Sequence, residues 1–213
     1  MNMLKGKVVI MNCPPNAGKD TITASLCQVT GAAHAEFKDQ LYKCTAALFN
    51  YPLEAFKELS TGRSTKELPC EDLGLPYENF CRLCDITGTE YPESRGKIYL
   101  SPREALIYTS EILMKPNFGQ DYFGKAAAKN VNKQFGSVFS DGGFNEELKP
   151  LIEEFGASNI FIVQFTRGDN VSFEGDSRNW LEIPEGVNCL RTGNNSTVAY
   201  LRDEIINWIR EVV

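Results

Sequence analysis

The sequence predicts a three-layer α/β fold in which helices cover both faces of a five-stranded parallel sheet. Two observations predict it. Five short apolar runs of strand length recur along the 213 residues, and strands that are buried on both faces read as continuous apolar runs. Segments with helical periodicity separate these runs, and an alternation of strands and helices is typical of a parallel sheet.

The elements follow in order along the chain. The expected strands are Lys7 to Asn12, Ala32 to Phe37, Ser137 to Asp141, Ile160 to Phe165 and Val187 to Leu190. The expected helices are Thr21 to Gln28, Lys38 to Asn50, Pro102 to Met114, Gln120 to Phe135, Asn145 to Phe155 and Thr197 to Val212. In the last helix, helical spacing predicts one face packed against the core, formed by Tyr200, Leu201, Ile205, Trp208 and Ile209.

The pattern breaks down between Tyr51 and Ser101, where prolines and glycines interrupt a stretch of mixed polarity. We interpret the chain as a single domain with a core at 1–50 and 137–213 and a substrate-side insertion at 51–136. A polar, glycine-containing loop at about 167–179 begins with Arg167 and contains Arg178. Its composition is typical of a short mobile lid.

Composition excludes several classes of function. The 22 Lys and Arg against 28 Asp and Glu give a formal charge of −6, without a basic stripe, so a nucleic-acid partner is not expected. No apolar stretch is long enough to span a membrane and no secretory leader is visible, so we expect a soluble protein. Seven scattered cysteines favour a reducing cytoplasm. Cys81 and Cys84 form a lone CxxC near Cys70, which leaves open a zinc site or ordinary small cysteines.

Residues 13–21 read CPPNAGKDT, directly after the first strand and directly before the first helix. In a phosphate-binding loop of the form G-x-x-x-x-G-K-[ST], backbone N–H groups surround phosphate oxygens and the Lys reaches the β- and γ-phosphates. Gly18 and Lys19 are in register with that pattern, whereas Cys13 replaces its first Gly and Asp20 replaces its Ser or Thr. The alternative is a turn with a chance Gly-Lys pair. The strand-to-helix context favours the phosphate loop, with contacts from Cys13, Asn16, Ala17, Gly18, Lys19, Asp20 and Thr21.

Polar residues follow the other strands as well. Asp141, Arg167 and Asn194 come after the third, fourth and fifth strands, and ligands bind outside the carboxyl ends of parallel strands. Asp141 is therefore a candidate ligand of Mg²⁺, together with Asp20 and Thr21, or else a cap for the helix expected at Asn145. Cationic side chains suited to phosphate recognition are Arg63, Arg103, Lys115, Arg167 and Arg178, although each is equally consistent with a solvated surface role.

Several segments, in order, resemble the bacteriophage deoxynucleoside monophosphate kinases. CPPNAGKDT resembles the GPPGxGKGT loop of adenylate-kinase-like enzymes and the GKDT ending of the phage group. The segments from Phe37, Ser101 and Gly119 resemble the family's FADPLK, TPRE and GxDxW motifs. The segment from Ser140 resembles SDVRFPNE, with Gly143 in place of its Arg, and the segment from Gly193 resembles an NDGS turn.

The resemblance implies a P-loop kinase that transfers the γ-phosphoryl group of ATP, with Mg²⁺, to a deoxynucleoside 5′-monophosphate. It implies catalytic roles for Lys19, Asp141, Arg167 and Arg178, an ATP contact at Asn194, and a location in the cytoplasm, that of the host if the protein is of phage origin. It implies acceptor binding by Phe37, Arg63, Arg103, Glu111, Lys115 and Asp121, and it is compatible with a homodimer.

Two alternatives remain open at this point. One is a P-loop kinase for another acceptor, such as dephospho-coenzyme A or a small alcohol. The other is a nucleotide-binding protein that lost catalysis, which the residues at Cys13 and Gly143 would explain. A GTPase is disfavoured because the base-reading N-K-x-D signature is missing from the sequence.

Overall fold

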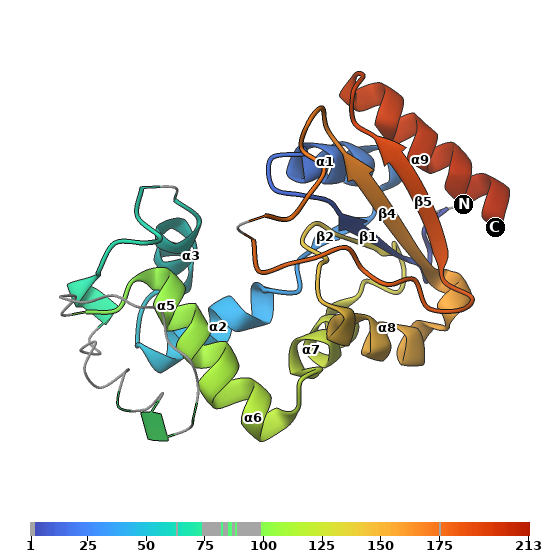
Figure 1. The fold of residues 1–213 in the computed structure, drawn as a ribbon. Helices are drawn as coiled ribbons and strands as arrows, with labels where there is room; N and C mark the ends of the chain where they lie inside the picture. The colour runs from blue at the N-terminus through green and yellow to red at the C-terminus, as the bar shows by residue number, and fades with distance from the viewer. Residues whose placement is uncertain are drawn as a thin grey trace. The chain divides into compact units, whose positions relative to one another are not determined.

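The chain divides into two compact units in a computed structural model (Figure 1). One unit comprises Met1–Phe37 and Phe123–Val213, and the other comprises Lys38–Tyr122. The sequence analysis expected an insertion from residue 51 to residue 136. In the structure the helix that follows residue 38 also belongs to the second unit, and residues 123–136 belong to the first. The structure describes residues 3–62, 64–73, 82, 85–86, 88, 99–174 and 176–213.

The first unit is built on a parallel sheet of five strands in the order β2-β3-β1-β4-β5. The strands are β1 (Val8–Asn12), β2 (Ala33–Ala35), β3 (Ser137–Phe139), β4 (Ile160–Thr166) and β5 (Asn188–Gly193). The helices of this unit are α1 (Lys19–Thr30), α7 (Tyr122–Asn130), α8 (Leu148–Phe155) and α9 (Val198–Val212), with 3-10 turns η3 (Asn145–Glu147) and η4 (Ala157–Asn159).

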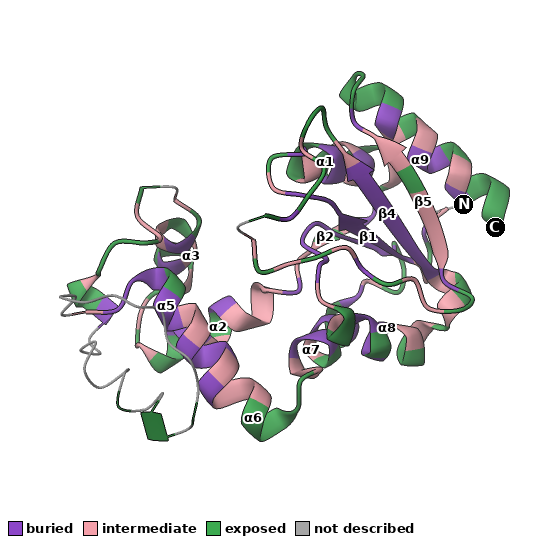
Figure 2. Ribbon diagram, viewed as in Figure 1, coloured by how far each residue is buried: buried purple, intermediate pink, exposed green. Residues whose placement is uncertain are grey.

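Helices cover both faces of this sheet. On one face, Ile22 and Leu26 of α1 and Ile205 of α9 pack with Val9 and Phe161 in one core cluster. On the other face, α7 and α8 pack against the alternate side chains of the same strands (Figure 1). Figure 2 shows β1 and β4 buried along their lengths. The predicted α/β class, with five parallel strands between two helical layers, is confirmed.

The strand order fixes where a ligand can bind. After β1 the chain crosses to β2 at one edge of the sheet, whereas after β4 it continues to β5 at the other edge. Because β1 and β4 are neighbours whose outgoing connections diverge, their carboxyl ends border a topological switch point. The loop of residues 13–18 leaves β1 at this position.

In the described residues of the second unit, the regular secondary structure is helical, apart from an isolated bridge residue at Tyr99. It contains α2 (Asp39–Leu48), α3 (Leu53–Thr61), η1 (Glu71–Leu73), α5 (Pro102–Ile107), a π-helix η2 (Tyr108–Met114) and α6 (Lys115–Phe118). Its core gathers around Phe56, which makes edge-to-face contacts with Tyr42 and Tyr51 at 6.3 Å between ring centroids. Within the described ranges, no helix is both long and apolar enough to cross a membrane.

The structure corrects three details of the predicted helices. The helix expected at 102–114 changes from α to π geometry at Tyr108, which apolar periodicity does not reveal. The helix expected at 120–135 ends at Asn130, because the Asn132 side chain accepts hydrogen bonds from the N–H groups of Gln134 and Phe135 in a competing turn. Tyr200 is 62% exposed, so it does not belong to the buried face of α9.

Candidate phosphate-binding site

The loop after β1 has the backbone geometry of an anion site. Gly18 is the N-cap of α1 at φ 94° and ψ 20°, a left-handed conformation that glycine adopts without steric cost, and Lys19 is the first helical residue. Helix α1 therefore starts two residues earlier than the apolar pattern predicted. The first N–H groups of a helix have no intrahelical acceptors, and the helix dipole adds partial positive charge there. A phosphate oxygen can accept hydrogen bonds from these groups.

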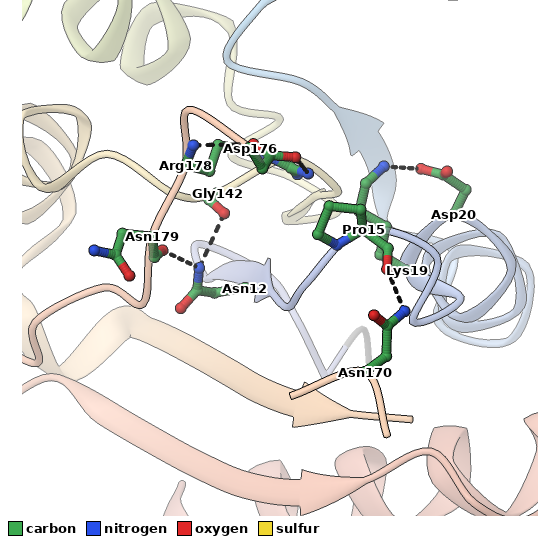
Figure 3. A network of polar contacts seen from close by, with 9 residues as sticks. All are labelled: Asn12, Pro15, Lys19, Asp20, Gly142, Asn170, Asp176, Arg178 and Asn179. Atoms are coloured by element: carbon green, nitrogen blue, oxygen red, sulfur yellow. Dashed lines mark hydrogen bonds and ion pairs between the residues drawn. The ribbon is translucent and has the colours of Figure 1, made fainter. Parts of the chain in front are cut away.

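Lys19 lies beside the loop but is paired with its neighbour. Its Nζ is 2.5 Å from Oδ1 of Asp20, and the Lys19 side chain is 17% exposed whereas that of Asp20 is 73% exposed (Figure 3). An ion pair with so exposed a carboxylate is weak, since water screens it. The ammonium group can therefore exchange this partner for a phosphate group at little cost in free energy.

Cys13 occupies the position at which phosphate loops of this pattern begin with Gly. Its backbone is not in the left-handed region, and its side chain is 1% exposed within the core cluster that α1 and α9 cover. Burial raises the pKa of this thiol to about 12, although the charges of Lys19 and Arg178 act in the opposite direction. Cys13 is thus a neutral core residue, and this backbone does not require Gly there.

Two asparagines fasten the loop to the segments after β4 and β5. Asn194, which is 6% exposed, donates from Nδ2 to the carbonyl of Ala17 at 2.8 Å. Asn170 donates from Nδ2 to the carbonyl of Pro15 at 2.5 Å (Figure 3). A side chain at Gly18 would lie 2.8 Å from Nδ2 of Asn194 and 3.7 Å from a guanidinium nitrogen of Arg167. Asn194 and Arg167 therefore both approach the loop at Gly18.

Asp141 follows β3 and is 7% exposed. Its Oδ1 accepts a hydrogen bond from the N–H of Phe37 at 2.9 Å. Asp141 is not the N-cap of the helix that follows, because Phe144 is the N-cap of η3. Phe37 is 2% exposed and packs against Phe139 at 4.5 Å between ring centroids, so its role is in the core and not in stacking on a base.

Arg178 belongs to the expected lid, yet its side chain is only 16% exposed. Its Nε and Nη2 donate to the two carboxylate oxygens of Asp176 at 3.0 and 2.7 Å (Figure 3). Burial lowers the pKa of Arg178, but the hydrogen bonds and charge of Asp176, with the charge of Asp141, raise it overall. The guanidinium group is therefore a fixed positive charge near Asp141 and the start of the phosphate loop.

The other predicted binding residues lie in the second unit. Arg103 is exposed and donates to Glu67 at 3.0 Å, and Lys115 donates to Glu111 at 2.7 Å. Glu111 lies in the π-helix, where Ser110 also donates to it at 2.8 Å. Asp121 is half-buried near the end of this unit. Arg63, Cys81 and Cys84 lie outside the described residues.

The side chains available at this site could hold Mg²⁺ only if phosphate oxygens supplied some of its ligands. Among the residues that the structure describes, no three acidic, His or Cys side chains gather as a metal-binding group. Asp20 and Thr21 are exposed at the start of α1, and Asp141 is buried after β3. Because Mg²⁺ in nucleotide sites takes one or two carboxylates together with phosphate oxygens and water, these residues fit that partial role.

The sequence-based prediction missed four residues that organise the site. Asn12 and Gln164 are buried and share a hydrogen bond of 3.0 Å, Asn170 holds Pro15, and Asp176 holds Arg178. A signal existed for the first two: Asn12 is the polar residue of β1, and Gln164 interrupts the apolar run of β4. Asn170 and Asp176 lie in a polar loop, where nothing in the pattern distinguishes them.

No protein-family model matches this chain, and no curated protein matches it either. The fold and the geometry above are therefore the basis for a functional assignment.

Proposed function

We propose that this protein transfers the γ-phosphoryl group of ATP to the 5′-phosphate of a deoxynucleoside monophosphate, which gives ADP and a deoxynucleoside diphosphate. The observation that carries the proposal is the left-handed Gly18 followed by Lys19 at the start of α1, at the switch point of a parallel sheet. Support also comes from the ordered motifs that resemble the phage deoxynucleoside monophosphate kinases.

In this proposal the first unit binds ATP. The N–H groups at the start of α1 bind phosphate oxygens, and Lys19 moves from Asp20 to the phosphates. Arg178, and Arg167 after β4, would stabilise negative charge on the transferring group, which is the main way in which proteins accelerate phosphoryl transfer. Asn194 would keep the loop in shape through its bond to the Ala17 carbonyl. Asp20, Thr21 and Asp141 would hold Mg²⁺, which neutralises phosphate charge when it is bound.

The acceptor monophosphate is assigned to residues of the second unit. Arg103 and Lys115 would bind its phosphate, with Glu111 and Asp121 as contacts to its sugar or base. Both cations pair with carboxylates that are 42% exposed or more, namely Glu67 and Glu111. Such pairs contribute little stability, so a phosphate dianion can replace the carboxylate. Arg63 remains part of this proposal on the resemblance alone.

We also propose that the reaction takes place in the cytoplasm, that of the host if the protein is of phage origin. In support, all five cysteines within the described residues are free thiols, as a reducing compartment favours. A homodimer is compatible with the family that the chain resembles.

A coupled ADP-release assay tests the proposal. ATP and Mg²⁺ are supplied with dAMP, dCMP, dGMP, dTMP or 5-hydroxymethyl-dCMP, and Lys19→Ala is compared with Lys149→Ala, a control at a lysine that is 73% exposed on α8. We expect turnover with at least one acceptor, its loss in Lys19→Ala and its retention in Lys149→Ala. Tight ATP binding by calorimetry without turnover on any of the five would refute the deoxynucleotide assignment and leave another acceptor or a catalytically inactive binder.

A further inference from the structure

The Arg178 side chain lies against Gly143. The two residues after Asp141 are both glycines, and a Cβ at Gly143 would collide with the Arg178 side chain, lying 2.6 Å from its Cγ and 3.0 Å from its Cδ. Gly143 is buried, so the aliphatic stem of Arg178 lies where any larger residue at 143 would need to be. The guanidinium carbon of Arg178 also lies over the ring of Phe173, 5.9 Å from its centroid.

Asn12 ties together the two backbone segments that enclose Arg178. Its Nδ2 donates to the carbonyl of Gly142 at 3.1 Å and to the carbonyl of Asn179 at 2.9 Å (Figure 3). Its Oδ1 accepts from the N–H of Leu181 at 2.9 Å and from Nε2 of Gln164 at 3.0 Å. All four hydrogen bonds of this buried amide are therefore made. Backbone donors and acceptors fix its orientation, because a flipped amide would face two carbonyls with its oxygen.

Two further bonds close the arrangement. The N–H of Asn179 donates to the carbonyl of Gly143 at 3.1 Å, and Nε2 of Gln164 donates to the carbonyl of Leu181 at 2.9 Å. Asn179, which follows Arg178, therefore accepts a hydrogen bond at its carbonyl from Asn12 of β1 and donates its N–H to Gly143 in the loop after β3. A loop held only at its ends would leave Arg178 free to move, whereas this one is fixed within one residue of the guanidinium side chain.

We propose that Asn12 is the positioning residue for Arg178: it holds the segment that carries Arg178 against Gly143, so that the arginine stands at the phosphate loop before any nucleotide binds. This inference rests on the proposed function for its catalytic consequence, though not for its structural one. Asn12 is the last residue of β1 and Lys19 is the first of α1, so the anchor of the arginine and the phosphate-binding lysine stand at the two ends of the same loop. Preorganised charge lowers a barrier because it needs no rearrangement during the reaction.

Asn12→Asp is the sharpest test. The substitution keeps the size and the acceptor at Oδ1, but it places a second oxygen against the carbonyls of Gly142 and Asn179. Asn188→Asp is the matched control, because Asn188 also donates from Nδ2 to two carbonyls, those of Ser158 and Ile160, at the amino end of β5. We expect Asn12→Asp to lower kcat by roughly 10- to 100-fold, the order of effect of a misplaced catalytic group, and Asn188→Asp to change kcat less than about threefold within the scatter of surface substitutions.

A double-mutant cycle separates positioning from general damage. We expect Asn12→Asp to have little further effect on kcat in an Arg178→Ala background, because it acts through that arginine. An undiminished loss in that background would overturn the proposal. Gly143→Ala approaches the same arginine from the opposite side and should reproduce the loss and its dependence on Arg178. It also serves in place of Asn12→Asp if that variant does not fold, and wild-type kcat in Gly143→Ala would overturn the proposal equally.

An NMR measurement tests the role of Asn12 independently of catalysis. If the wild-type protein transfers no phosphoryl group to any acceptor, the proposed function is refuted, but the role of Asn12 in positioning Arg178 can still be tested. The Nε–H of Arg178 donates to Asp176, so its ¹H–¹⁵N signal should exchange slowly with solvent in the wild type and in Asn188→Asp. We expect that protection to be lost in Asn12→Asp, or in Gly143→Ala. Unchanged protection in these variants would show that Asn12 and Gly143 do not hold Arg178.

Discussion

Substitution of Gly18 by Ala tests whether the left-handed turn at the start of α1 builds the phosphate site. An L-residue in this conformation costs about 1–2 kcal/mol, and the added Cβ would lie 2.8 Å from Nδ2 of Asn194. Asn194 must then move and lose its buried bond to the Ala17 carbonyl, which costs a further 1–3 kcal/mol or so. A more restricted unfolded chain offsets about 0.4–1 kcal/mol. The expected loss of stability is therefore about 2–4 kcal/mol, together with loss of ATP binding.

Gly31→Ala is the matched control, because Gly31 ends the same helix at φ 74° and its Cβ would meet nothing within 4 Å. This variant carries the backbone strain without the collision, so we expect a loss of about 1 kcal/mol and unchanged ATP binding. Urea unfolding measures the first quantity and calorimetry the second. If Gly18→Ala destabilises no more than Gly31→Ala and still binds ATP, the contact with Asn194 is unimportant and the turn does not form the site.

Three further outcomes follow from the charges and burial around these elements. Cys13→Gly should lose about 1–2 kcal/mol of stability without a gain in turnover, because it removes a core side chain where no left-handed backbone needs glycine; urea unfolding and the kinase assay measure these. Asp20→Asn should tighten ATP binding without metal by roughly three- to tenfold, since it removes an exposed negative charge that repels the phosphates and pairs with Lys19. Calorimetry with and without EDTA measures the affinity, and an unchanged affinity would contradict this prediction. Burial raises the pKa of Asp39, but its hydrogen bond and ion pair with Lys57 lower it overall. The stability that this pair contributes is therefore present above the ordinary Asp pKa and is lost as pH falls through the depressed pKa. In Lys57→Met the pKa of Asp39, measured by NMR titration, should rise.

Apolar runs predicted the sheet because strands buried on both faces leave little choice of residue. The run Ile160 to Phe165 marks β4, and the strand extends only one residue beyond it. The phosphate loop could likewise be located, since Gly18 and Lys19 stand between a strand and a helix. These features depend on local geometry, which short stretches of sequence specify.

Contacts between distant segments could not be predicted in this way. Asn12 bonds to Gly142, Gln164 and Asn179, which are more than a hundred residues away along the chain. A polar residue at the end of a buried strand signals that partners exist, because an unpaired buried amide would cost several kcal/mol or so. Nothing in the sequence says which segments supply the partners, since that depends on the order of the strands.

Gly143 shows how an apparent loss in the sequence can be a consequence of packing. Against the motif SDVRFPNE, Gly143 stands in place of an arginine, which on sequence alone suggests a weakened phosphate site. The structure places the stem of Arg178 on Gly143, so an arginine at 143 and the observed position of Arg178 exclude each other sterically. Gly143→Arg should therefore not restore activity by adding a charge. It should displace Arg178 and lower kcat, and a gain in kcat would show that the two cations can act together.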